Sequence, residues 1–187
     1  GCGKSTLLQL VAGILVPEEG RLEVVGRDLT RLGEGGRRAH RVQTIGFVFQ
    51  DFPLIEHLTA EENVLLPYRL NRALRLDGEA RRRARRLLED LGVAHRAGHR
   101  PTELSQGECQ RVAIGRALIA EPAMLLADEP TAGLDDARRD EVMSLIEQAS
   151  SKRGLTLVMV THDKELLGRF DRTVPVEVLV TGPEARP

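Results

Sequence analysis

The chain has 187 residues, 41% hydrophobic and 29% charged, a balance that suits one globular domain with a sizeable core. Its formal net charge of −1 argues against a general nucleic-acid-binding protein, which needs a broad basic face. Cys2 and Cys109 are in no metal-ligand spacing, so we expect free thiols in a reducing cytosol rather than a zinc site or a disulfide.

The first fifty residues alternate between helix, turn and strand patterns. We predict a glycine-rich loop and helix over 1–13, a turn over 17–20, a strand over 21–26, an exposed loop over 31–38 and a buried strand over 44–50.

Residues 51–104 change character, because prolines punctuate short helical stretches and β-branched runs are almost absent. The clearest helix of this segment has one apolar stripe, and Gly92 stands where a C-terminal cap is expected. The stripe consists of Ala80, Ala84, Leu87, Leu88 and Leu91.

The last third alternates helices with buried strands. Ser105 followed by Glu108 is a capping box, which marks the start of a helix. The expected elements are a helix over 105–120, a strand over 123–128, a helix over 136–151, a strand over 155–162 and a short helix over 164–170. This alternation predicts a parallel sheet covered on both faces.

Arginines crowd one segment that has few acids. They are Arg69, Arg72, Arg75, Arg81, Arg82, Arg83, Arg85, Arg86, Arg96 and Arg100. A solvated helical face is the simpler interpretation, and a surface for an anionic partner or lipid headgroups is the alternative.

The chain begins inside a phosphate-binding motif, G-x-x-x-x-G-K-[ST], so we expect a fragment that lacks its N-terminal strands. The residues that match the motif or lie within it are Gly1, Cys2, Gly3, Lys4, Ser5 and Thr6. Glycines let backbone N–H groups curl around phosphate oxygens, Lys4 reaches the β and γ phosphates, and the Ser5 hydroxyl suits Mg²⁺. A glycine-rich turn before a capping serine is the structural alternative.

Two carboxylates follow the apolar run of residues 124–127, at the end of a buried strand, where α/β folds place ligands. Asp128 suits a Mg²⁺ ligand. Glu129 could deprotonate a water for attack on a γ-phosphate. Taken alone, a strand that ends in Asp-Glu is often only a solvated strand end.

The order of these motifs resembles the ABC ATPase superfamily. The matching elements are Walker A at 1–6, the Q-loop at Gln50, the signature LSQGE at 104–108, Walker B at 124–129, the D-loop GLD at 133–135 and the switch histidine His162. The resemblance implies an α/β P-loop NTPase with a RecA-like parallel sheet, an ABC-type helical subdomain and a small antiparallel β portion. It also implies one nucleotide-binding domain, with its ATPase core at 1–50 and 122–187 and its helical subdomain at 51–121.

The same resemblance implies an ATPase that uses ATP and Mg²⁺ and closes head to tail with a second subunit. Ser5, Gln50 and Asp128 would hold Mg²⁺, and Glu129, Gln50 and His162 would be catalytic. Nucleotide would also contact Ser105, Gln106, Gly107 and Asp135. The signature departs from the family pattern at Gln106, Glu108 and Cys109, which puts the strength of the trans contact in doubt. The aromatic that stacks on adenine would precede the chain.

Three stretches resemble the branch of lipoprotein-release, macrolide-export and cell-division ATPases: IGFVFQDFPLIEHLTAEENVLLP, HRAGHRPTELSQGECQRVAIGRALIAEP and LLADEPTAGLD. The implied protein is cytoplasmic, peripheral on the inner face of the membrane, and paired with transmembrane permease subunits. The alternatives are a soluble ABC ATPase and an ATP-driven signal relay such as a cell-division regulator. Docking of the permease would involve Phe52, Leu54, Ile55 and Leu58, which could equally be core residues.

Overall fold

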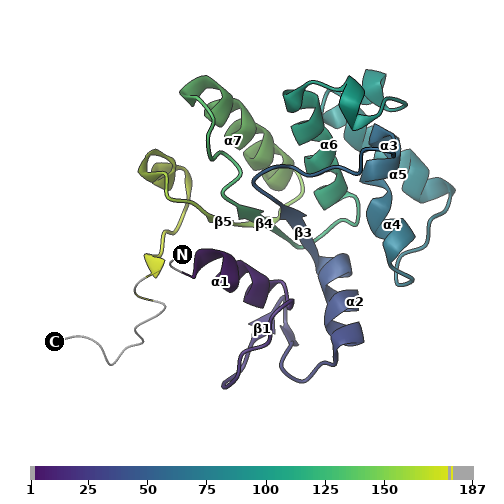
Figure 1. Cartoon of the computed structure of the whole chain (residues 1–187). Coiled ribbons are helices and arrows are strands. Elements are labelled where there is room, and N and C mark those ends of the chain that lie inside the picture. Colours follow the sequence, from purple (N-terminus) through teal and green to yellow (C-terminus); the bar gives the residue numbers. More distant parts are fainter. Residues whose placement is uncertain (1–2, 177, 179–187) are drawn as a thin grey trace.

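The centre of the protein is a parallel sheet of three strands (Figure 1), in a computed structural model that describes residues 3–176 and 178. The strands lie in the order β3 (Ile45–Val48), β4 (Met124–Asp128) and β5 (Thr156–Val160). Val48 pairs with Ala127, and Asp128 pairs with Val160. The predicted parallel α/β sheet is therefore present, and its strands end together at one edge.

Both faces of the central strand β4 are buried, as its continuous apolar run predicts, whereas most of β5 is only half-buried. On β4, Leu125 and Ala127 belong to one hydrophobic core, whereas Leu126 points to the other face and a second core. The smaller core contains helix α1 (Lys4–Val11) and a hairpin of β1 (Glu23–Val24) and β2 (Arg27–Asp28). This hairpin is the small antiparallel portion that was expected.

The larger core lies under helices α6 (Gln106–Leu118) and α7 (Asp136–Ser151). Helices α3 (Ala60–Val64) and α5 (Gly78–Asp90) pack on α6, and α4 (Leu66–Leu70) contacts α3 (Figure 1). The remaining elements are α2 (Glu34–Thr44), η1 (Ala94–Arg96), η2 (Pro101–Glu103) and η3 (Lys164–Arg169). Among the described helices, none has the length and apolar character needed to cross a bilayer.

The predicted exposed loop over 31–38 is wrong in its second half, because α2 begins at Glu34. Two glycines there lower the local helix propensity. Tertiary contacts override it: Arg41 of α2 donates hydrogen bonds to the carbonyls of Ala12 and Gly13, both at 3.2 Å, and His40 lies buried against the carbonyl of Val24.

The predicted strand over 21–26 is also too long. Val25 and Gly26 both have positive φ, so the chain turns there and leaves two strands of two residues each. The strands predicted over 44–50 and 155–162 end at Val48 and Val160. The helix predicted from the apolar stripe is confirmed as α5, with Gly92 following it at a φ of 69°.

β3 and α6 approach each other closely at Gly46. A Cβ at this position would overlap the carbonyl oxygen of Ala117 and lie 2.9 Å from Cδ1 of Leu125. Only hydrogen fits there. The strand before Gln50 and the signature helix are thereby held in direct backbone contact.

We predict that Gly46→Ala lowers the free energy of unfolding by about 1–3 kcal/mol or more, since the added methyl group must displace backbone. Gly35→Ala is the control, because Gly35 lies in α2 and its Cβ would meet nothing within 4 Å. The control should gain about 0.8 kcal/mol from helix propensity. Urea denaturation of both variants measures the difference, and equal stabilities would contradict the close contact.

Candidate functional site

Side chains from three separate segments meet where β4 and β5 end. Glu129 follows β4, and His162 lies two residues beyond the end of β5. Lys4 begins α1, which packs against both strands (Figure 1). Because β4 and β5 are parallel neighbours, their carboxyl ends bring Glu129 and His162 to the same edge.

The carboxylate of Glu129 binds both other groups. Lys4 Nζ lies 3.1 Å from Oε1, and His162 Nδ1 lies 2.6 Å from Oε2. The side chain of Glu129 is 23% exposed, whereas that of His162 is 68% exposed. The imidazole is therefore held at one nitrogen and open to solvent on most of its surface.

Two opposing effects act on the pKa of Glu129. Burial raises it, but hydrogen bonds and charges from Lys4 and His162 outweigh burial, so the pKa lies below its ordinary value. The carboxylate is thus ionised at neutral pH and can accept protons or hydrogen bonds. The basicity of Glu129 therefore depends on whether Lys4 remains paired with it.

The backbone of Glu129 is strained, because its φ is 44°, in the left-handed region that non-glycine residues avoid. Its N–H donates to the carbonyl of Val160 at 3.0 Å, which ties the turn to the end of β5. A left-handed residue directly after a buried strand turns the side chain out of the sheet. Strain of this kind is concentrated at functional sites.

A pair of hard oxygen donors lies beside this cluster. Ser5 Oγ donates to Asp128 Oδ1 at 3.4 Å, so the predicted metal ligands Ser5 and Asp128 are brought together. Two protein oxygens fit the way Mg²⁺ is bound, with water and phosphate supplying the other ligands. Within residues 3–176 and 178, no group of three or more His, Cys, Asp or Glu residues could hold a metal alone.

Gln50, the third predicted metal ligand, follows β3, the neighbour of β4 on the side away from β5. It lines a neighbouring cavity of about 200 Å³ with Phe52, Gln106 and Gln110. In the described part of the chain no hydrogen bond joins Gln50 to Ser5, Asp128 or Glu129, so its role stays a prediction.

The signature segment is an exposed helix N-terminus. Ser105 caps α6 by accepting from the N–H of Glu108, and Glu108 accepts from the N–H of Ser105 at 2.7 Å, which is the predicted capping box. The Ser105 backbone and the Arg96 guanidinium, 2.9 Å away, lower the pKa of Glu108 to about 2. Glu108 therefore holds the signature helix start to η1.

The D-loop reaches the signature from the other side. Asp135 caps α7 by accepting from the N–H of Arg138 at 3.0 Å. Arg138 in turn donates to Oε1 of Gln106 at 3.5 Å. Asp135, Gln106 and Ser105 thus belong to one surface, and Gly107 has open space around its Cα. No hydrogen bond links them to Lys4 within the described residues.

Of the other residues predicted for the phosphate loop, the structure describes Gly3 and Thr6. Gly1 and Cys2 lie outside the described residues. Gly3 has a φ of 83°, in the left-handed region that favours glycine, and its carbonyl accepts the first helical hydrogen bond of α1 from Leu7 at 2.9 Å. Thr6 is exposed in the first turn.

Arg139 is a neighbour of the site that the sequence analysis missed. Its guanidinium, 16% exposed, contacts three carboxylates, Asp136 and Asp163 at 3.2 Å and Glu165 at 2.7 Å. Asp163 directly follows His162, so Arg139 fixes the histidine loop to the first turn of α7. No local pattern reveals this, because Asp163 and Glu165 lie more than 20 residues from Arg139 in the sequence.

An apolar groove of about 450 Å³ lies between α2, β3 and α4. Of the four residues predicted for docking, Leu54 and Ile55 line it. Phe52 does not, because it is buried in the larger core, and Leu58 is also outside the lining. Phe49 contributes instead, 43% exposed and stacked on Phe47 at 4.3 Å between ring centroids.

The chain is similar to several known proteins. Residues 1–132 match the family described as ABC transporter. The lipoprotein-releasing system ATP-binding protein LolD of Geobacter metallireducens is 47% identical over 93% of this chain and 76% of its own. The ABC transporter ATP-binding protein YtrE of Bacillus subtilis is 43% identical over 89% and 71%.

A solved structure is similar as well. It is the dimeric post-hydrolysis state of the ATP-binding cassette MJ0796 bound to ADP and Pi. The TM-score is 0.74, with 38% identity over 88% of this chain and 72% of that one.

We predict that Glu108→Gln lowers the melting temperature at pH 7, because glutamine keeps the cap but loses the charge facing Arg96. Because the pKa of Glu108 is lower in the folded than in the unfolded protein, the ionised carboxylate stabilises the fold at pH values above its ordinary pKa of 4.5. This stabilisation is lost as the pH falls towards about 2. The melting-temperature difference should therefore shrink as the pH falls below the ordinary value of 4.5.

The control is Glu89→Gln, an exposed carboxylate without an ion pair in the described region, which should change little at any pH. A Glu108→Gln difference that stays unchanged down to pH 3 would contradict the assignment.

Proposed function

The chain belongs to the ABC transporter family, and on that premise we propose that its ATP hydrolysis drives a transporter of the lipoprotein-release or macrolide-export branch. The chain is an ABC-type ATPase, the ATP-binding subunit of such a system. The assignment of roles to its residues is our proposal. It rests on the contact of Lys4 and His162 with one carboxylate.

In this proposal Lys4 pairs with Glu129 when no nucleotide is bound and with the phosphates of ATP when nucleotide is bound. The ammonium group now neutralises Glu129, and the phosphates of ATP would compete for it because they carry more negative charge. When Lys4 turns to phosphate, Glu129 loses the partner that lowers its pKa. Nucleotide binding would thus make Glu129 a stronger base for the attacking water.

His162 would act beside that base. With Nδ1 donating to Glu129, the tautomer leaves Nε2 free as an acceptor, and protonation would make it a donor to phosphate. The strained turn at Glu129 keeps the two side chains together without help from substrate. Gln50 would enter from the neighbouring cavity.

Mg²⁺ would be held by Ser5 and Asp128, with Gln50 as a further oxygen ligand. The two oxygens already lie within hydrogen-bond distance of each other. Such an ion supplies charge neutralisation at the phosphates.

The exposed signature surface would complete the site of a second copy. Ser105, Gln106 and Gly107 offer a helix N-terminus to a γ-phosphate, which is an anion-binding arrangement. The dimeric MJ0796 structure supports a two-subunit assembly for this family. Asp135 would contact the same interface, since Arg138 joins it to Gln106.

We assign the apolar groove beside α2 and α4 to a cytoplasmic segment of the permease. Its lining is mostly aliphatic and aromatic, and Phe49 and Ile55 are exposed in it. A subunit held there would be peripheral on the inner face of the membrane. Residues 51–121 would then form the helical subdomain that links docking to the signature, and 1–50 with 122–187 the ATPase core.

A Glu129→Gln variant tests the proposal. Glutamine keeps the shape but cannot take the proton of water, so turnover should fall by about 10² to 10⁴. ATP binding should persist, and a dimer should accumulate with ATP and Mg²⁺, which light scattering detects. Glu89→Gln is the matched control and should hydrolyse ATP at the wild-type rate; a Glu129→Gln protein doing the same would remove the base assignment.

We further predict that Arg139→Met lowers kcat about tenfold and leaves KM for ATP unchanged. Without the guanidinium, Asp136, Asp163 and Glu165 repel one another and the His162 loop shifts. Arg139→Lys should restore part of kcat.

Arg169→Met is the control for Arg139, because Arg169 also ties α7 to η3 through Asp140 and Glu147 but lies away from the histidine. Steady-state ATPase assays separate the two. If Arg139→Met lowered only the melting temperature and spared kcat, the residue would be structural.

A further inference from the structure

Helix α5 and the turn before it carry most of the positive charge of the helical region. Residues 69–86 contain eight arginines against two acids, although the whole chain has a net charge of −1. Seven of these arginines are exposed, and we call them the arginine surface: Arg69, Arg72, Arg75, Arg81, Arg82, Arg85 and Arg86. The rest of the chain is therefore acidic, and the charge is segregated.

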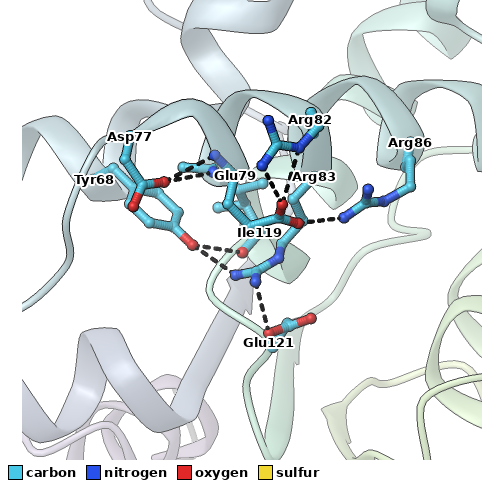
Figure 2. A network of polar contacts seen from close by, with 9 residues as sticks. Tyr68, Asp77, Glu79, Arg82, Arg83, Arg86, Ile119 and Glu121 are labelled. Atoms are coloured by element: carbon cyan, nitrogen blue, oxygen red, sulfur yellow. Dashed lines mark hydrogen bonds and ion pairs between the residues drawn. The ribbon is translucent and has the colours of Figure 1, made fainter.

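The local acids neutralise only part of this surface. Figure 2 shows Glu79 between Arg82 and Arg86, bound to both at 2.7–2.8 Å. Arg83, the eighth arginine, turns inward to the Tyr68 hydroxyl at 2.9 Å and to Glu121 at 3.2 Å (Figure 2), so it has a structural role.

Three members of the surface keep their charge without a partner. Within the part of the chain that the structure describes, Arg72, Arg75 and Arg81 make no ion pair, whereas Arg69 and Arg85 pair with Glu62 and Glu61. Arg75 has a longer-range attraction to Asp77, but these three guanidinium groups over ten residues are only partly compensated and repel one another in the free protein. An anionic surface would relieve that repulsion.

The shape of the surface favours many small anions over one ligand. The cavity beside α5 is lined by three carboxylates that offset its three arginines, so it has no net positive charge to attract an anion; these residues are Glu89, Asp90, Glu121, Arg83, Arg86 and Arg153. The unpaired arginines project from a turn and a helix start. A fluid array of phosphates can meet such a surface, whereas a single acidic peptide needs a groove.

The surface also adjoins the groove that we assign to the permease. Leu66, Pro67 and Leu70 of α4 line that groove, and Arg38 of α2 donates to the Leu70 carbonyl at 3.2 Å. Leu70 is 61% exposed, next to Arg69 and close to Arg72. An exposed leucine among arginines suits the boundary between headgroups and acyl chains.

We propose that the arginine surface binds the anionic lipid headgroups of the bilayer that holds the permease. The inference rests on the proposed permease docking, because the turn between α4 and α5 begins at Leu70 and Asn71, which line the groove assigned to the permease. Guanidinium groups bind phosphate oxygens in pairs, and the inner leaflet is negatively charged. The contact would orient the subunit before and during docking.

The test is co-sedimentation of the full-length protein, without permease, with phosphatidylcholine vesicles that contain or lack about one third phosphatidylglycerol. The wild type should bind only the anionic vesicles, and less as salt rises. The variant with Arg72→Gln, Arg75→Gln and Arg81→Gln should bind about 100-fold more weakly, from roughly fivefold for each arginine.

The control variant neutralises three exposed cations elsewhere, Arg27→Gln, Arg31→Gln and Lys152→Gln, with the same change of net charge. It should bind like the wild type. Vesicle binding retained by the first variant, or lost equally by the control, would overturn the inference. So would a wild type that ignores vesicles while the first variant fails to copurify with the permease, which would assign the surface to an acidic protein segment.

ATPase activity, measured on the same samples, keeps the two proposals apart. Vesicle binding by a protein that hydrolyses no ATP would contradict the proposed function alone. Normal hydrolysis by a protein that ignores anionic vesicles would contradict only the lipid contact.

Discussion

The parallel pairing of β4 with β5 is the constraint on which the site depends. Asp128 is level with Val160, so the residues that follow each strand emerge side by side. The strained φ of Glu129 then turns its carboxylate out of the sheet to meet Lys4 and His162. A shift of one residue in this register would exchange the two faces of β4 and separate the three groups.

Charge pairs outside the sheet connect this edge to the rest of the molecule. Arg139 fixes the histidine loop to α7, and Arg138 joins the start of α7 to Gln106 of the signature helix. Gly46 brings β3 against the other end of that helix. These contacts join the start of the signature helix to the edge of the sheet where Glu129 and His162 lie.

The sequence predicts the elements whose signals are local. The capping box at Ser105 and Glu108 identifies α6, and apolar strands identify the parallel sheet. Prediction from the sequence fails where contacts between distant residues determine the structure. Helix α2 forms despite its glycines because Arg41 donates hydrogen bonds to carbonyls 28 and 29 residues away. The role of Arg139 could not be predicted either, because its partners Asp163 and Glu165 are distant in sequence.

The aromatic residues of the groove, Phe47 and Phe49, fluoresce only weakly, and these 187 residues contain no tryptophan and a single tyrosine. That tyrosine, Tyr68, is engaged by Arg83. A Phe49→Trp substitution would place a single tryptophan in these 187 residues, at an exposed position of the groove. The emission of this tryptophan would depend on the polarity of the groove. Binding of a partner there could therefore be followed by intrinsic fluorescence in the presence of unlabelled lipids.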